Sequence, residues 1–187
     1  MMNTKALWIL ILLSGLLTNI SAQNMKRTFI GIQPMITKEK FYDKGEFDLN
    51  IIPLVVQVSL SEVVEIRALS IVNMHFGTNS EVSHVGAELG LPLYPFRKRE
   101  SAMKGIYTAP VFAMVHNRVT SSKEYTFAIE PGYSWIFQKG FSINAGLQFG
   151  GTYFDGTVDG NALKDHFGFK ISLGYSFFRD KKYKQET

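Results

Sequence analysis

The segment HFGFKISLGYSFF, residues 166–178, constrains the fold more than any other part of the chain. Side chains of an extended strand alternate between its two faces, so this segment has one large apolar face and one face of mostly small residues. The apolar face carries Phe167, Phe169, Ile171, Leu173, Tyr175 and Phe177. The opposite face carries Gly168, Lys170, Ser172, Gly174 and Ser176. A strand of this length and asymmetry is typical of the wall of a lipid-facing β-barrel.

The N-terminal residues 1–22 predict a cleaved signal peptide. Lys5 precedes an apolar run over 6–17, and Ser21-Ala22 supply the small residues of a cleavage site. This run is too short for a membrane-spanning helix, which needs about 20 apolar residues. We therefore expect a single mature domain, with a barrel over 23–178 and a charged tail over 179–187.

The rest of the chain reads as a series of extended segments separated by polar or glycine-containing connections. These segments span 26–37, 48–59, 62–76, 83–94, 105–118, 124–138, 140–154 and 166–178. Strands of about ten residues are long enough to cross a bilayer while tilted. Tight turns alternate with longer polar loops, as in a barrel whose two chain ends lie on the same side. The sequence predicts an all-β fold: an eight-stranded antiparallel up-and-down transmembrane β-barrel.

The composition of the polar strand faces separates a membrane barrel from a soluble one, which has the same alternation turned inside out. In the three clearest strands, 124–138, 140–154 and 166–178, that face carries only Glu130 and Lys170 as charged residues. A water-exposed surface is richer in charge, so these faces fit a narrow lumen better. A soluble periplasmic ligand-binding barrel is the alternative. The aromatic residues predicted to form membrane girdles are Tyr133, Trp135, Phe137, Phe141, Tyr153, Phe167, Tyr175 and Phe177.

The mature chain as a whole resembles the small outer-membrane β-barrels of the OmpA/OmpX type. Its last strand is similar to their C-terminal assembly signal, with Gly174, Tyr175 and Phe177 at matching positions. The chain departs from many such barrels by continuing into the charged tail. The resemblance implies an integral outer-membrane location, contact with outer-membrane lipid and recognition by the outer-membrane insertion machinery. It implies a structural or interaction role in the envelope, with other envelope proteins as possible partners.

Five charged residues are predicted to point into the lumen. They are Glu65, Arg67, Glu88, Glu130 and Lys170. A low-dielectric interior strongly favours pairing such charges. An eight-stranded barrel is also just wide enough for side chains to fill it. We therefore expect a closed polar lumen in place of a conducting pore.

Histidines gather at the predicted outer rim of the barrel. His75, His84 and His166 fall on the lumen side, and Glu88 lies on the same face as His84. Imidazoles and a carboxylate can bind zinc or copper, which makes these four residues candidate metal ligands. The alternative is that histidine simply suits an amphipathic rim. We expect no cofactor.

Known lipid-modifying barrels provide the comparison for an enzymatic function. An outer-membrane lipid A deacylase carries a His-x-Ser arrangement with a distant glutamate. Here Gly86 stands two residues after His84, and Ser83 precedes the histidine. A nucleophilic serine needs a base within hydrogen-bond reach, and the sequence shows no clear pair. No reaction is therefore assigned. A lipid-modifying outer-membrane enzyme of the lipid A deacylase type stays the alternative function, with His75 and Ser80 across the loop as its open pair.

The charge distribution argues against nucleic-acid binding. The formal net charge is +4, and its basic clusters, Arg97-Lys98-Arg99 and the C-terminal tail, lie outside the aromatic strands. The absence of cysteine excludes disulfides and thiolate metal sites. Partner contacts are possible at the basic turn, at the tail and at the loop over 37–47, where Phe41, Tyr42 and Phe47 lie. The alternative to partner binding is that the basic turn is a solvated, positively charged end of the barrel and that the loop aromatics fold back onto the barrel rim.

Overall fold

The computed structural model describes residues 25–37, 44–77, 80–96, 104–156 and 162–180. The predicted signal peptide, the basic triplet 97–99, Phe41, Tyr42 and residues 181–187 of the tail lie outside these described residues.

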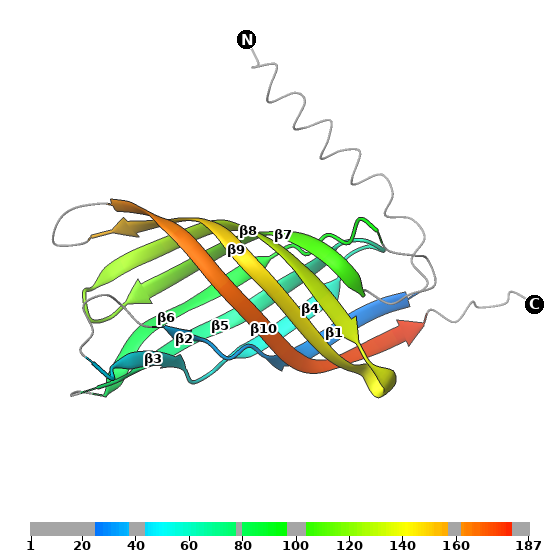
Figure 1. Ribbon diagram of the computed structural model, residues 1–187, viewed down its shortest axis with the longest axis horizontal. Helices are drawn as coiled ribbons and strands as arrows, with labels where there is room; N and C mark the ends of the chain where they lie inside the picture. Colours follow the sequence, from blue (N-terminus) through cyan, green and yellow to red (C-terminus); the bar gives the residue numbers. More distant parts are fainter. Residues whose placement is uncertain (1–24, 38–43, 78–79, 97–103, 157–161, 181–187) are drawn as a thin grey trace, which may run out of the picture.

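The described residues form one antiparallel sheet that closes into a barrel (Figure 1). In chain order the elements are β1 (Met25–Ile32), β2 (Ile36–Thr37), β3 (Phe47–Asn50), β4 (Leu54–Ser59), β5 (Glu65–Phe76), β6 (Glu81–Gly90), β7 (Gly105–Asn117), β8 (Ser122–Ile136), η1 (Gln138–Gly140), β9 (Phe141–Asp155) and β10 (Ala162–Asp180). Neighbouring strands from β5 to β10 pair in sequence order, and β1 pairs with β10 to complete the wall.

Two of the eight barrel strands are interrupted, which is why the elements carry ten strand labels. β1 pairs with β4 and β2 pairs with β3, while β3 and β4 both pair with β5. The interruptions fall at Pro34 and Pro53, because proline has no N–H to donate to a strand ladder. β1–β2 and β3–β4 are therefore the first and second strands of an eight-stranded up-and-down barrel. The predicted all-β, eight-stranded antiparallel up-and-down barrel is confirmed.

Strand bounds differ from the prediction by four residues at two places and by fewer elsewhere. The regular part of β6 ends at Gly90, and the predicted continuation to residue 94 is an irregular segment in which Leu91 and Leu93 still hydrogen-bond to β7 while Pro92 and Tyr94 are buried at the barrel end. β10 is longer than the predicted 166–178, since it stays paired with β9 as far as Ala162 and with β1 as far as Asp180. The strand therefore extends two residues into the predicted tail.

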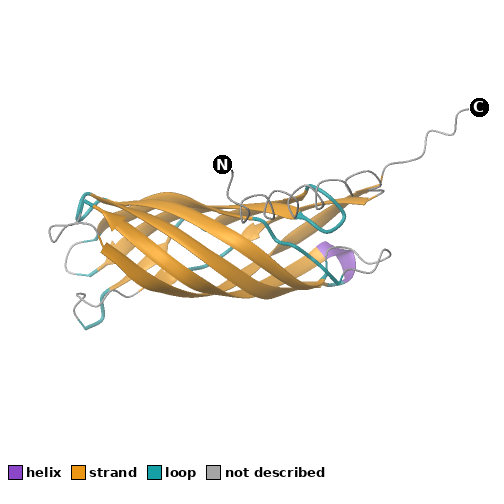
Figure 2. Cartoon of the chain, turned by 90° about the horizontal axis from the view of Figure 1, so that it is seen from above, coloured by secondary structure: helices purple, strands orange, loops and turns teal. Residues whose placement is uncertain are grey.

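The two ends of the barrel differ in their connections (Figure 2). One end, called the turn side here, carries the β4–β5 turn and the tight β8–β9 turn, where Lys139 and Gly140 adopt φ values of 64° and 88°. The start of β1 and the end of β10 also lie on the turn side, because Met25 pairs with Asp180. The other end, the loop side, carries the connections between β5 and β6, β7 and β8, and β9 and β10.

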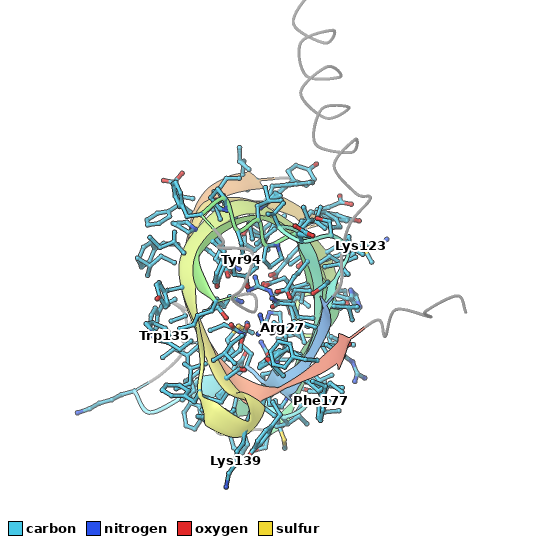
Figure 3. All side chains as sticks on the ribbon, turned by 90° about the vertical axis from the view of Figure 1, so that its right-hand side faces the viewer. Arg27, Tyr94, Lys123, Trp135, Lys139 and Phe177 are labelled. Atoms are coloured by element: carbon cyan, nitrogen blue, oxygen red, sulfur yellow. The ribbon has the colours of Figure 1, made fainter. Side chains whose placement is uncertain are left out.

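The placement of polar and apolar side chains is the reverse of that in a water-soluble protein. The fully enclosed side chains include Arg27, Gln57, Glu65, Glu130 and Gln148, all at most 2% exposed. The outward side chains of the wall are apolar, such as Phe127, Phe167 and Phe177, each more than half exposed. Figure 3 looks along the barrel, with Arg27 and Tyr94 inside the wall and Trp135 and Phe177 outside it. Among the described residues, no helix has the length and apolar character needed to cross a membrane.

Candidate functional site

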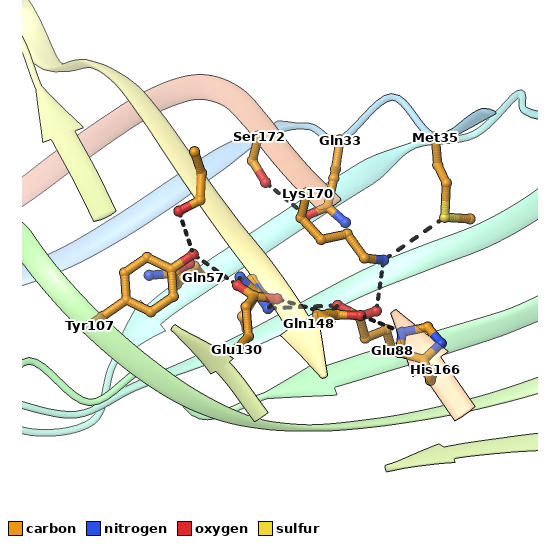
Figure 4. Close-up of polar contacts among 12 residues, drawn as sticks. Gln33, Met35, Gln57, Glu88, Tyr107, Glu130, Gln148, His166, Lys170 and Ser172 are labelled. Atoms are coloured by element: carbon orange, nitrogen blue, oxygen red, sulfur yellow. Dashed lines mark hydrogen bonds and ion pairs between the residues drawn. The ribbon is translucent and has the colours of Figure 1, made fainter. Parts of the chain in front are cut away.

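A network of charged residues crosses the middle of the lumen, and we call it the central network. It joins Arg67 on β5, Glu88 on β6, Glu130 on β8 and Lys170 on β10 (Figure 4). Arg67 donates from both terminal nitrogens to the two carboxylate oxygens of Glu130, at 2.7 Å each, and lies 3.6 Å from Glu88. Lys170 Nζ lies 3.0 Å from the other oxygen of Glu88. Four strands are thereby connected by ion pairs across the lumen.

Neutral residues complete the central network. Tyr107 on β7 donates its hydroxyl to Glu130 Oε1 at 2.8 Å. Gln148 on β9 donates to Glu130 Oε2 at 2.8 Å and to Glu88 Oε1 at 3.3 Å. The amide oxygen of Gln148 lies 3.0 Å from His166 Nε2 on β10. Each carboxylate therefore has several partners, which offsets the cost of taking it out of water.

A second group, the turn-side cluster, fills the lumen nearer the turns. It consists of Arg27, Gln57, Ser59, Glu65, Tyr94, Ser142 and Ser176. Arg27 lies 3.3 Å from Glu65 and donates to Ser176 at 2.8 Å. Gln57 donates to Glu65 and, at 3.2 Å, to the Tyr94 hydroxyl. Side chains from β1, β4, β5 and β10 thus meet beneath the segment that follows β6.

Tyr94 closes the turn side and connects the two groups. It lies outside the strands, is 1% exposed, and its ring centroid is 5.6 Å from that of Tyr107 in the central network. Burial, with the nearby charge of Glu65, raises the pKa of the Tyr94 hydroxyl above its usual range. The hydroxyl therefore stays neutral and continues to accept from Gln57.

The enclosed charges of the two groups balance. Arg27, Arg67 and Lys170 face Glu65, Glu88 and Glu130, so three cations meet three carboxylates. The structure thus brings four of the five predicted lumen charges into the central network and places Glu65 in the turn-side cluster. The polar side chains block the lumen through its turn-side and middle parts.

A cavity of about 540 Å³ occupies the loop-side part of the lumen, beyond the central network. Glu88 and Lys170 border it on the network side, and Ile71, Ala113 and Val115 supply apolar wall. The sequence predicted the polar network but not this cavity, so side chains fill the lumen over only part of its length.

The rim histidines have two kinds of partner: His75 and His84 share a carboxylate, and His166 contacts an amide. Asp48 on β3 lies against both His75 and His84, with Nδ1 of each 3.1 Å from one of its oxygens. His166 instead contacts Gln148, and Glu88 is engaged with Lys170. In the described part of the chain, no three His, Cys, Asp or Glu side chains are arranged to hold a metal ion. The structure does not bring the four candidate ligands together.

Ser83 and His84 are adjacent but lack the geometry of a hydrolase. A β-bulge after Asn73 turns both inward, and Ser83 Oγ lies 3.0 Å from His84 Nδ1. That same nitrogen faces Asp48, whereas an activated serine and its orienting acid occupy opposite ring nitrogens of the base. Ser83 is also 0% exposed, and it donates to Asp48 and to the Asn73 carbonyl. The three residues form a structural link between β3, β5 and β6.

The predicted girdle residues lie on the outside of the wall in two groups. Near the turn side are Tyr133, Trp135, Phe137, Phe141, Tyr175 and Phe177, with ring contacts such as Tyr133–Trp135 at 4.6 Å and Phe141–Tyr175 at 5.8 Å. Nearer the loop side are Tyr153 and Phe167, whose neighbours Tyr125 and Phe149 lie 6.5 and 5.3 Å away.

Several network residues were missed at the sequence level. They are Arg27, Asp48, Gln57, Tyr94, Tyr107 and Gln148. Arg27 and Gln57 could have been found from the period-two pattern, because they alternate with outward residues on β1 and β4. Tyr94 carries no such signal, since it lies outside the ladder.

Comparisons of the chain with protein-family models, curated proteins and solved structures found no match. The assignment of a function therefore depends on the geometry of the barrel and its lumen.

Proposed function

We propose that this chain is an integral outer-membrane β-barrel protein of the small OmpA/OmpX type. Its role is structural or interaction-related in the bacterial envelope, and it forms no open pore. The observation that carries the proposal is the inverted polarity of the barrel: the enclosed face holds the charges and the outward face is apolar. A soluble barrel has the opposite arrangement, with an apolar core and a charged surface.

The outward face supports a lipid environment in a second way. Many of its aromatic residues lie toward the two barrel ends, and the band between them is apolar, with aliphatic side chains such as Ile129, Leu147 and Ile171 beside Phe149 and Phe169. Aromatic girdles around a central apolar band are characteristic of outer-membrane barrels. Closure of the sheet also fits lipid, because a closed barrel leaves few unpaired backbone groups facing hydrocarbon.

Localisation in cells tests the proposal directly. We expect the full chain, expressed with its N-terminal segment, to sediment with outer membranes and to resist alkaline carbonate extraction. The folded protein should migrate faster on an unheated gel than after boiling, because a closed barrel resists the detergent. Recovery of the protein in the soluble periplasmic fraction would contradict the proposal and favour the ligand-binding alternative.

The balanced charges in the lumen predict that the barrel does not conduct ions. The turn-side cluster and the central network block the lumen, and breaking buried ion pairs to open it is costly. Planar-bilayer recordings of the reconstituted protein should show no large, stable conductance. Flotation of the protein with the lipid used for the bilayers controls for insertion, so that an absence of conductance reflects a closed lumen. Stable channels from the unmodified protein would refute a closed lumen.

A further inference from the structure

The wall of the barrel is incomplete beside the cavity. β1 pairs with β10 from Met25–Asp180 to Ile32–Leu173, and the pairing stops there. Beyond that point β2 pairs with β3 alone. Within the described ranges, no strand pairs with the β1-side edge of β10 over 168–172. We call the boundary between 33–37 and 168–172 the seam.

Pro34 explains why the ladder stops. The N–H of Gln33 points away from β10, because it donates to the Pro53 carbonyl at 2.7 Å. Successive backbone N–H groups in a strand point to opposite edges, so the donor aimed at β10 should come from residue 34. Proline has no N–H, and this donor is missing. The seam is therefore encoded in the sequence.

Two side-chain contacts cross the seam on its inner face (Figure 4). Ser172 Oγ donates to Gln33 Oε1 at 2.8 Å, and Lys170 Nζ lies 3.9 Å from Met35 Sδ. On the outer face the flanking residues are apolar: Ile36 is 70% exposed and Phe169 is 63% exposed. Lipid facing the seam would therefore meet apolar side chains and no backbone ladder.

The cavity reaches the wall at the seam. Met35 and Lys170 line the cavity from the two sides of the seam. The other strand residues lining it point inward, with two exceptions, Asp165 and Phe167. Both exceptions lie on β10. Among the described residues that line the cavity, those with outward side chains therefore lie on β10, the strand whose ladder is incomplete.

The cavity lining indicates the chemistry of its occupant. The charges at its inner border are already paired, Lys170 with Glu88 and Arg67 with Glu130, so a charge added at that border would have no counter-ion. The other charged carboxylate and lysine residues of the lining, Glu124, Lys164 and Asp165, lie at its loop-side end. Apolar walls suit a hydrocarbon portion. The amide of Asn73 also lines the cavity, and its oxygen has no hydrogen-bond partner among the described residues. An uncharged amphipath with a hydroxyl group satisfies these conditions.

We propose that the cavity binds an uncharged single-chain amphipath, such as a monoacylglycerol, which enters from the bilayer through the seam. This inference rests on the proposed membrane location. A cavity of about 540 Å³ is in the size range of small-molecule sites, too small for a two-chain phospholipid. The chain passes between β2 and β10, and the hydroxyl end lies near Asn73.

Photolabelling in vesicles tests the occupant. The protein is reconstituted into phosphatidylcholine vesicles containing 1-monolauroylglycerol with a diazirine on its acyl chain. Lipid around the barrel labels outward residues such as Met114, whereas an occupied cavity also labels its inward neighbour Val115. We expect Ala113→Phe, which fills the cavity, to reduce Val115 labelling by about tenfold or more and to leave Met114 labelling unchanged. Ala87→Phe, which adds the same ring on the outward face of β6, should change neither.

A cross-link tests the route. The chain has no cysteine, so Ile36→Cys and Phe169→Cys can be joined across the seam with a short bis-thiol reagent. Continuation of the β1–β10 register places these residues opposite each other. The cross-link should slow Val115 labelling several-fold. Ile30→Cys with Tyr175→Cys joins the same strands where they are already paired, and it should have no effect.

The outcomes separate this inference from the proposed function. Protein that fails to float with the vesicles refutes the membrane location itself. Protein that floats but shows no Val115 labelling, or equal labelling after Ala113→Phe, refutes the occupant. Unchanged labelling after the seam cross-link refutes lateral entry. Equal cavity labelling by matched diazirine probes bearing a carboxylate or an ammonium group refutes the preference for an uncharged molecule.

Discussion

Replacement of Arg67 by leucine is expected to destabilise the barrel by about 3–5 kcal/mol, the cost of leaving a buried carboxylate without its partner. Arg67 is 2% exposed and forms a bidentate pair with Glu130, which is 0% exposed. Removing the guanidinium leaves Glu130 with Tyr107 and Gln148 as neutral donors and also weakens the attraction on Glu88. Urea unfolding in vesicles, followed by the fluorescence of Trp135, measures the loss.

Two companion variants show whether the loss comes from the unpaired charge. Arg67→Leu/Glu130→Leu should recover much of the stability, because replacing both members of a buried pair by apolar residues is often neutral. Arg118→Leu removes an exposed cation near the loop side and should change the free energy of unfolding little. A double variant as unstable as Arg67→Leu alone would indicate that the guanidinium acts mainly by packing.

The proposed membrane location predicts that Leu147→Arg lowers the stability of the barrel in vesicles by about 2–4 kcal/mol, because the wall at this position would face the middle of the bilayer. Leu147 lies at the centre of β9, points outward and is 39% exposed. On a water-facing surface the same substitution would have little effect. The free energy of unfolding in vesicles distinguishes these two environments.

The same substitution at a different depth along the barrel provides the matched comparison for Leu147→Arg. Leu163 is 76% exposed near the loop-side start of β10, where a charge can reach the interface, so Leu163→Arg should cost only about 0–1 kcal/mol. Leu147→Met controls for loss of the leucine side chain. Equal effects of arginine at both depths would contradict a membrane-embedded wall.

The sequence was most informative where the two faces of a strand differ strongly. β8, β9 and β10 were predicted well, because large apolar residues alternate there with glycine, serine and asparagine. The interruptions after β1 and β3 were not predicted, although Pro34 and Pro53 mark them. One proline within an apolar run is compatible with several backbone paths, and the partner strand decides among them.

The candidate site was only partly predictable for a related reason. Charged residues such as Arg67, Glu88 and Lys170 stand out on a polar strand face, so their inward direction follows from period-two counting. Which of them meet depends on strand tilt and register around the barrel. Tyr107 was missed because the faces of its strand were ambiguous in sequence. The cavity arises from side chains on several strands far apart in the chain, and no local pattern encodes it.

Pairing between β1 and β10 has a consequence for the order of assembly. The two strands come from opposite ends of the described chain, so their contact closes the longest loop in the molecule and carries the largest entropic cost. Such nonlocal pairing is expected to form late. Until then, the growing sheet has two open edges, whose unpaired N–H and C=O groups are poorly tolerated in hydrocarbon. The chain is therefore most prone to aggregation just before its final strand pairs with its first.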